Sequence, residues 1–260
     1  MKKIKLITGI VLMGIILFTT SIKAQNSDTS YLTTTHVLTA QGMILSNITT
    51  NRISYTEGED RIIEETVMGN SSYPEPNGGT HVSKMIENYT SINGQVVFYK
   101  GKFIEGDSTM IIQAEKDGDD FIVQGKNEGE MDFYEWDRQK MKDIDFFVFA
   151  IDYEKQKFTK RSKIRKIYDM YSLTLRDNKL SHLGNETLDL AGETFECSII
   201  KFNYKVVKGK MWWVKLDDGN YLLVKEEAES AHDGPFNMDL TDFSTEKPSK
   251  SKIIEGEFGF

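Results

Sequence analysis

The chain has 260 residues, of which 32 are basic, 40 are acidic and 39% are hydrophobic. Its first 24 residues contain four lysines and no acid, so the remainder carries a formal charge of −12. An acidic chain repels nucleic acid phosphates, which argues against a nucleic-acid-binding protein. The one cysteine, Cys197, has no partner for an internal disulfide, and we expect it to be a buried apolar thiol.

The N-terminus has the pattern of a bacterial secretory signal peptide. Lys2, Lys3 and Lys5 come first, an apolar run ends at Phe18, and a small residue, Ala24, follows shortly after. The apolar run is shorter than the about 20 residues that a membrane-spanning helix needs. No later segment is long and apolar enough to cross a bilayer as a helix. We therefore expect cleavage near Ala24 and a periplasmic or secreted protein without an integral membrane span.

The mature chain is dominated by short alternating runs separated by Gly, Asn and Asp, which predicts antiparallel strands joined by hairpins. Residues 69–80 hold two prolines and three glycines and are expected to form a long loop. The predicted strands cover residues 37–46, 51–56, 60–68, 81–91, 95–100, 108–115, 120–125, 131–135, 163–176, 180–190, 194–207, 210–217, 220–228 and 236–243. The pattern does not decide whether residues 36–135 form a separate sheet or the first half of one barrel.

One segment has a different period. Met141, Ile144, Val148 and Ile151 recur at steps of three and four residues, which predicts a helix over residues 138–153. The alternative is a strand through the aromatic and β-branched residues at 146–149.

The alternation of apolar residues changes phase within the strand expected at 194–207. Phe195, Cys197 and Ile199 share one parity, whereas Ile200 and Phe202 share the other. A β-bulge at this point would restore the alternation, and bulges bend strands. The expected fold is therefore mainly β, with a curved antiparallel sheet that forms an incomplete barrel together with one or two helices. The expected organisation is a signal peptide at 1–24, a flexible leader at 25–35, the β-rich domain at 36–245 and a tail or terminal strand at 246–260.

No catalytic or metal-binding motif is present in the sequence. The four histidines lack metal-ligand spacing, and no nucleophile elbow or phosphate-binding loop occurs, so we expect no enzyme activity, no cofactor and no metal site. Trp212 shares parity with Val214 and Leu216 and is expected to face the interior, while Trp213 faces outward. The favoured interpretation of both rings is that they are packing residues, because aromatic side chains supply much of a core's buried area. The residues expected to line an apolar ligand cavity are Trp212, Val214, Phe202, Tyr204, Ile200, Phe236 and Met238.

Part of the sequence resembles a family of uncharacterised periplasmic proteins. Residues 184–197, which include the step Thr194-Phe195-Glu196-Cys197, are similar to a recurring stretch of that family, as are residues 211–214 and 221–227. Residues 166–169 and 175–176 echo an upstream part of the same family more loosely. The fold of this domain-of-unknown-function group resembles that of the lipoprotein-localisation carriers. The resemblance implies an incomplete antiparallel barrel wrapped around helices, with a hydrophobic cavity, and it brings no catalytic residues.

Three functional hypotheses follow. The first is a non-enzymatic binding protein of the cell envelope that shelters a lipid or another apolar ligand in the barrel. The second is a structural or protein-interaction module with a packed core, whose exposed strand edge pairs with an envelope protein. The third is an outer-membrane barrel, suggested by the aromatic C-terminus, but most predicted strands are shorter than the about ten residues such barrels use.

Overall fold

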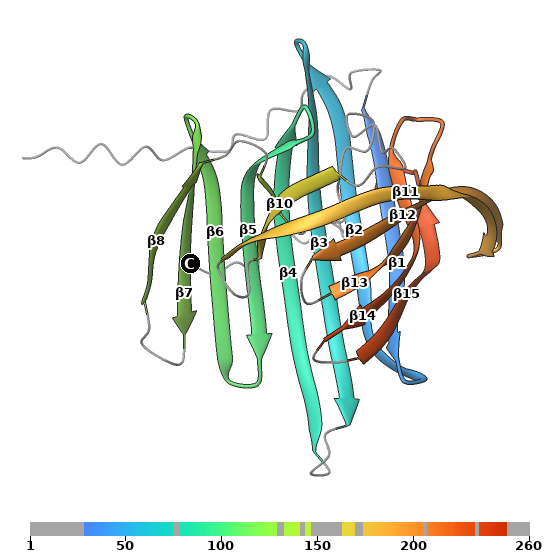
Figure 1. Ribbon diagram of the computed structural model, residues 1–260, viewed down its shortest axis with the longest axis horizontal. Coiled ribbons are helices and arrows are strands. Elements are labelled where there is room, and N and C mark those ends of the chain that lie inside the picture. Colours follow the sequence, from blue (N-terminus) through green and yellow to red (C-terminus); the bar gives the residue numbers. More distant parts are fainter. Residues whose placement is uncertain are drawn as a thin grey trace, which may run out of the picture.

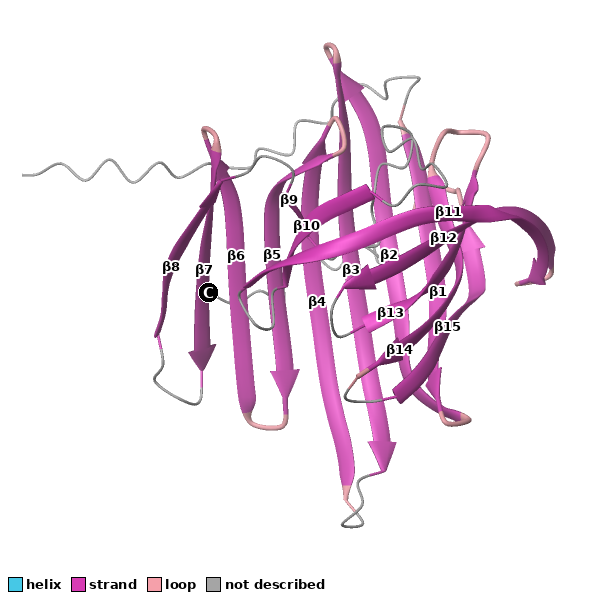
Figure 2. Ribbon diagram, in the orientation of Figure 1, coloured by secondary structure: helices cyan, strands magenta, loops and turns pink. Residues whose placement is uncertain are grey.

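The structure is a computed structural model that describes residues 29–74, 79–128, 133–140, 144–146, 163–169, 174–204, 207–231 and 234–248. In this part of the chain every regular element is a β-strand (Figure 2). The strands are β1 (Ser30–Ala40), β2 (Met43–Glu57), β3 (Asp60–Pro74), β4 (Thr80–Ile92), β5 (Gln95–Glu105), β6 (Ser108–Asp117), β7 (Asp120–Glu128), β8 (Phe133–Lys140), β9 (Ile144–Phe146), β10 (Lys163–Asp169), β11 (Thr174–Leu190), β12 (Glu193–Tyr204), β13 (Val207–Lys215), β14 (Tyr221–Ser230) and β15 (Gly234–Ser244).

These strands form one sheet in the order β8-β7-β6-β5-β4-β3-β2-β1-β15-β14-β13-β12-β11-β10-β9. The first strand therefore pairs with the last, and residues 36–135 belong to the same sheet as the rest of the chain. Neighbours are antiparallel except for β9 and β10, which are parallel. Tight turns join most of them, and the turn at Asn93-Gly94 has φ angles of 53° and 75°, as Asn-Gly hairpin turns require.

The sheet curls so strongly that its second half, β9 to β15, crosses in front of the first half, β1 to β8 (Figure 1). Within the described part of the chain, no strand pairs with the outer side of β8 or of β9, so the sheet does not close. The predicted incomplete barrel is thus confirmed.

The space between the two halves holds the larger of two apolar cores. Tyr99 and Phe121 from the first half are 1% exposed, and they belong to the same cluster as Phe202 and Trp213 from the second half. Each such side chain contributes about 1.5–3 kcal/mol by leaving water. The smaller core is centred on residues from β1 and from β12 to β15, namely Leu32, Phe195, Cys197, Trp212, Leu222, Val224 and Leu240.

The two cores use opposite faces of β12, as the phase change in the sequence requires. Phe195 and Cys197 pack in the smaller core, whereas Ile200 and Phe202 pack in the larger one. A register shift lies at the predicted place, because Ile200 pairs with His182 and Ile199 pairs with Gly184. The extra residue therefore belongs to β11, not to β12 as the alternation suggested.

Several expected boundaries are wrong. Residues 138–140 end β8 and residues 144–146 form β9, so the described parts of the predicted 138–153 helix are strand, and the rest of it lies outside the described residues. Residues 30–35, expected in the leader, begin β1, and β3 extends to Pro74 into the expected loop. No break falls near residue 178, because β11 runs through that position, where its residues pair antiparallel with β10.

Two further expectations can be compared only with the described residues. Residues 245–248 follow β15 without regular structure, and the remaining C-terminal residues lie outside the described part. None of the described residues forms a helix that could cross a membrane.

Candidate ligand-binding pocket

A small pocket opens between β1 and β2 on one side and β13 to β15 on the other. It encloses about 340 Å³ of space between atoms, counting the solvent in its mouth, but the centres of water molecules fit in only about 20 Å³ of it. A single buried water needs about 10–15 Å³ by this measure, so the pocket as it stands holds little more than one. Its lining residues are Leu32, Thr34, His36, Ile48, Thr50, Arg52, Trp213, Tyr221, Leu222, Leu223 and Met238.

One wall of the pocket is polar and comes from β1 and β2. Side chains alternate between the faces of a strand, so Thr34 and its neighbours two residues away share the inner face of β1. Thr34 pairs with Thr50 on β2, and both side chains are buried, at 4% and 7% exposure. Two hydroxyl-bearing side chains therefore lie side by side at the pocket.

The opposite wall is apolar and comes from the second half of the sheet. Trp213, Leu223 and Met238 are each less than 5% exposed, and they line the pocket from three neighbouring strands. A pocket with few polar groups on one wall and apolar side chains on the other is suited to an amphiphilic molecule.

His36 joins the polar wall to the apolar one. Its ring Nε2–H donates to the carbonyl oxygen of Leu223 at 2.8 Å. Burial lowers the pKa of His36 below its usual value of 6.5, and the hydrogen bond to Leu223 opposes that effect in part. The ring is therefore neutral at neutral pH and acts in the pocket as a hydrogen-bonding group without a charge.

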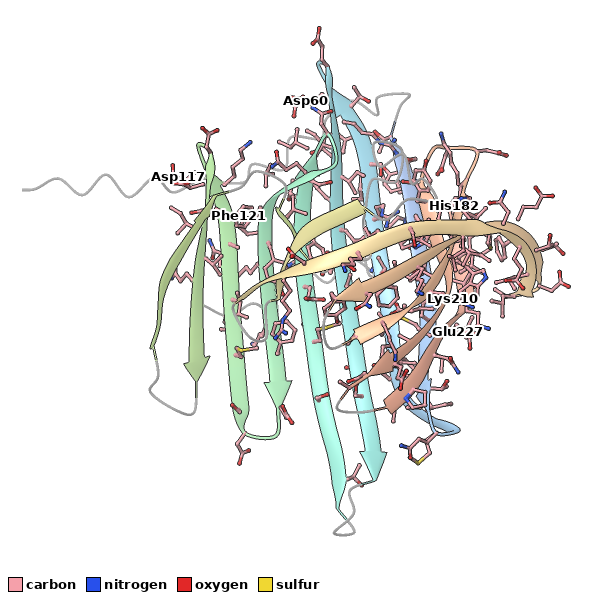
Figure 3. The ribbon with its side chains drawn as sticks, in the orientation of Figure 1. Asp60, Asp117, Phe121, His182, Lys210 and Glu227 are labelled. Carbon is pink, nitrogen blue, oxygen red and sulfur yellow. The ribbon has the colours of Figure 1, made fainter. Side chains whose placement is uncertain are left out.

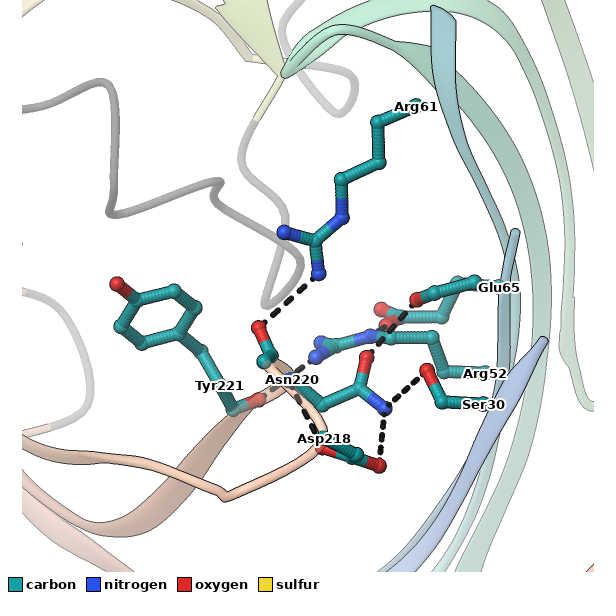
Figure 4. A network of polar contacts seen from close by, with 9 residues as sticks. Ser30, Arg52, Arg61, Glu65, Asp218, Asn220 and Tyr221 are labelled. Atoms are coloured by element: carbon teal, nitrogen blue, oxygen red, sulfur yellow. Dashed lines mark hydrogen bonds and ion pairs between the residues drawn. The ribbon is translucent and has the colours of Figure 1, made fainter. Parts of the chain in front are cut away.

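Arg52 forms the edge of a polar row that crosses the sheet. Its Nε donates to Oε2 of Glu65 at 2.6 Å, and its Nη1 donates to the carbonyl oxygen of Tyr221 at 2.6 Å (Figure 4). Arg52 pairs with Glu65 across β2 and β3, and Glu65 pairs with Tyr89 on β4. Among the described residues, Oε1 of Glu65 has no hydrogen-bond partner.

The row continues to a second buried carboxyl group. The Tyr99 hydroxyl donates to Oε1 of Glu87 at 2.8 Å. Burial raises the pKa of Glu87 to about 7, against the lowering effect of the Tyr99 hydrogen bond, and the charge of Glu65 raises it further. The interior of the first half is thus apolar around a narrow polar strip, which extends from the pocket towards β5.

The expected burial of Trp212 is confirmed, but the outward orientation expected of Trp213 is wrong. Trp213 lines the pocket, whereas Trp212 packs in the smaller core, where its Nε1 donates to Oε2 of Glu186 at 2.7 Å. Lys225 lies 5.3 Å and Lys210 6.0 Å from the centre of the Trp212 ring (Lys210 is labelled in Figure 3). Trp212 therefore has the contacts of a packing residue.

Trp212 is buried but lies outside the pocket, because the face of β13 to which it belongs packs in the smaller core. Val214 and Leu216 do share a face with Trp212, as expected, and all three pack in the smaller core. A register shift between Trp212 and Trp213 leaves Val224 as the extra residue on β14, which separates the two faces at this point.

The other residues expected at the cavity are distributed as follows. Met238 lines the pocket. Ile200 and Phe202 lie within the larger core, and Tyr204 and Phe236 pack against it, so these four belong to the interior but not to the pocket.

The pocket residues on β1 and β2 were missed by the sequence reasoning. Thr34, His36, Thr50 and Arg52 are polar, and the first two precede the predicted start of the first strand. The alternation of Leu32, Thr34 and His36 on one face was the signal that could have revealed them.

Two further observations bear on chemistry. No group of three or more metal-ligating side chains occurs among the residues that the structure describes. Cys197 is 1% exposed, and the prediction of a buried thiol is confirmed. Burial, followed by the nearby charge of Glu186, raises the pKa of this thiol to about 11, so it is a poor nucleophile at neutral pH.

Comparison with known proteins agrees with the fold and goes no further. No protein-family model matches the chain, and no curated protein matches it. Among solved structures, the chain is similar to a beta-barrel-like protein of Domain of Unknown Function DUF1849 from Brucella abortus. The TM-score is 0.52, the match covers 84% of this chain and 98% of that one, and the sequences are 7% identical. At this identity the likeness shows an uncharacterised beta-barrel-like fold alone.

Proposed function

We propose that this chain is a non-enzymatic binding protein of the cell envelope that holds an amphiphilic ligand, such as a lipid, between the two halves of its sheet. The observation that carries the proposal is that one wall of the pocket is polar and the opposite wall is apolar. The hydroxyl-bearing side chains of Thr34 and Thr50 face a wall that contains Trp213 and Met238. A polar head group would hydrogen-bond to these hydroxyls, and an apolar chain would lie against the tryptophan side.

The size of the pocket sets a condition on this function. Ligand pockets usually enclose about 300–1,000 Å³, whereas only about 20 Å³ of this pocket admits the centre of a water molecule. An acyl chain therefore requires part of the wall formed by β13 and β14 to move away from β1 and β2, because β15 is paired with β1. The structure would then correspond to the closed, empty form of the binding protein.

The proposed location rests on the N-terminal sequence. Three lysines, an apolar run and Ala24 have the order of a secretory signal. Export to the periplasm or beyond would place the protein among lipids and lipoproteins, where a carrier of amphiphiles has substrates.

The experiment compares two threonines that are adjacent on β2 but point to opposite faces. The protein is expressed in a bacterium with its own N-terminus, purified from the envelope fraction without detergent, and extracted for lipid mass spectrometry. We expect a co-purifying amphiphile whose amount falls at least tenfold in Thr50→Leu and is unchanged in Thr49→Leu. Equal amounts in both variants, or no amphiphile in the wild type, would refute the proposed site.

A second candidate function is supported by the filled interior. Side chains from both halves meet in the larger core, and strands β8 and β9 end the sheet without a further described partner. A module of this kind would act by adding a strand of another envelope protein to one edge. The same purification separates the two candidates, because one stoichiometric protein partner without lipid supports the module.

A further inference from the structure

The segment before and at the start of β14 lies beyond the part of β15 that pairs with β14. Pairing between β14 and β15 begins only at Lys225, so residues 219–223 have β13 on one side and no strand on the other. The Leu216 amide donates to the carbonyl of Asn220 at 2.8 Å, which shows that the carbonyl of Asn220 faces β13. Because carbonyls alternate along a strand, those of residues 221 and 223 face away from β13, towards the first half of the sheet, as does that of Gly219 in the preceding turn.

Side chains from three strands of the first half occupy these three carbonyls in order. Nη2 of Arg61 donates to Gly219 at 3.0 Å. Nη1 of Arg52 donates to the carbonyl of residue 221 at 2.6 Å, and Nε2 of His36 donates to that of residue 223 at 2.8 Å. The donors come from β3, β2 and β1, so the row takes the place of the missing neighbour strand.

The side chain of Asn220 fixes the same segment at its other side. Its Oδ1 accepts from the Ser54 hydroxyl at 2.8 Å, and its Nδ2 donates to the Ser30 hydroxyl at 3.0 Å and to Oδ2 of Asp218 at 2.9 Å (Figure 4). Asn220 is 1% exposed. Residues 219–223, called the latch below, are thus tied to the first half by polar contacts to their backbone and to one buried amide.

The latch is also a wall of the pocket, because Tyr221, Leu222 and Leu223 line it. Opening the latch would exchange its polar contacts for water, at small net cost when both partners become solvated, and would expose only two buried apolar side chains, those of Leu222 and Leu223. We propose that the latch is the moving part of the closed form, and that its release from Arg61, Arg52 and His36 controls access of small molecules to the pocket. This inference rests on the proposed function only in taking the pocket as the binding site.

The test measures local opening without any ligand. Hydrogen exchange is followed by mass spectrometry for a peptide covering the latch and for one covering residues 227–230, which pair with β15. We expect Asn220→Ala and Arg61→Gln each to speed exchange in the latch peptide at least tenfold and to leave the other peptide unchanged. Asn237→Ala, an exposed position on β15, is the matched control and should change neither.

Access to the pocket is measured separately by acrylamide quenching of Trp213 in a protein whose other two tryptophans are replaced by Phe. The quenching constant should rise at least threefold in the latch variants and stay at the wild-type value in the control. Unchanged exchange, exchange that rises equally in both peptides, or faster exchange without more quenching would overturn the inference. If Asn220→Ala does not fold by circular dichroism, the partly exposed Arg61→Gln decides the result.

The two proposals fail in different ways. If the latch variants open the pocket but neither they nor the wild type carry an amphiphile, the latch stands and the proposed ligand class is wrong.

Discussion

A buried carboxyl group on β14 gives the sharpest test of how the interior is built. Glu226 is 3% exposed and pairs with Met211 on β13 and Met238 on β15, so its cross-strand neighbours are apolar. Burial raises its pKa from 4.5 to about 7. The folded protein therefore keeps the proton between these pH values, whereas the unfolded chain releases it.

The sign and size of the effect follow directly. Because the folded-state pKa of Glu226 is the higher one, its contribution to stability is complete below pH 4.5 and is lost as the pH rises through about 7. At about 1.4 kcal/mol for each pKa unit, the loss amounts to about 3 kcal/mol. Glu226→Gln has no proton to lose, so the free energy of unfolding of the wild type should fall by about 3 kcal/mol relative to the variant between pH 4 and 8.5.

The assay is urea unfolding followed by circular dichroism at half-unit pH steps. Glu87 also has a raised pKa, but it is present in both proteins and cancels in the comparison. The control is Glu227→Gln, because that neighbouring side chain is 44% exposed and its ion pair with Lys225 contributes about 0–1 kcal/mol. Parallel pH profiles for the wild type and Glu226→Gln would show that the carboxyl group is hydrated in the folded protein, and the reasoning would be wrong.

Three further predictions concern the pocket and its support. Arg52→Met leaves the carboxylate of Glu65 buried without its ion pair, so the free energy of unfolding measured in urea should fall by about 3–5 kcal/mol. The double variant Arg52→Met/Glu65→Met should recover most of this loss, and equal losses in the single and double variants would contradict the prediction. Gly209→Ala puts a methyl group against a backbone carbonyl of β14, so thermal unfolding should show a free energy of unfolding that is lower by about 1–3 kcal/mol. An unchanged free energy of unfolding would show that β13 and β14 do not approach each other so closely at this position. Burial lowers the pKa of His36, so the folded protein takes up this proton at a lower pH than the unfolded chain does. Below pH 6.5 the free energy of unfolding of the wild type should therefore fall more steeply with acid than that of His36→Gln, and equal slopes for the two proteins would contradict this prediction.

The sheet and its curvature could be predicted from the sequence because they depend on local signals. Turn dipeptides such as Asn93-Gly94 marked the hairpins, and the phase change at Ile199-Ile200 marked the bend. These signals do not depend on which strands meet in space. The pairing of β1 with β15, which places the two halves of the pocket, joins residues about 200 positions apart and has no local signal.

The expected helix shows the limit of periodicity in a short segment. The steps from Met141 to Ile151 fit a helical face, but Ile144 and Phe146 lie in β9, beside β10. Pairing within the sheet decided the conformation of these described residues, as tertiary context often does. The alternative of a strand through Phe146 agrees with the residue that is described.

The site residues were the hardest to predict because the fold has two interiors. An apolar face on β13 predicted that Trp212 is buried, and it is, at 4% exposure. The sequence did not show that this face packs in the smaller core, while Trp213 faces the pocket. The polar residues of the pocket, such as Thr50, look like surface positions until the facing half of the sheet is known.

The most direct test of the account is native mass spectrometry of the protein purified from bacterial envelopes without detergent. We predict a wild-type population with the mass of one chain plus one amphiphile, and a Thr50→Leu population with the mass of the chain alone. A wild-type protein that carries no small molecule, and that instead appears with one stoichiometric protein partner, would contradict ligand binding and favour the interaction module.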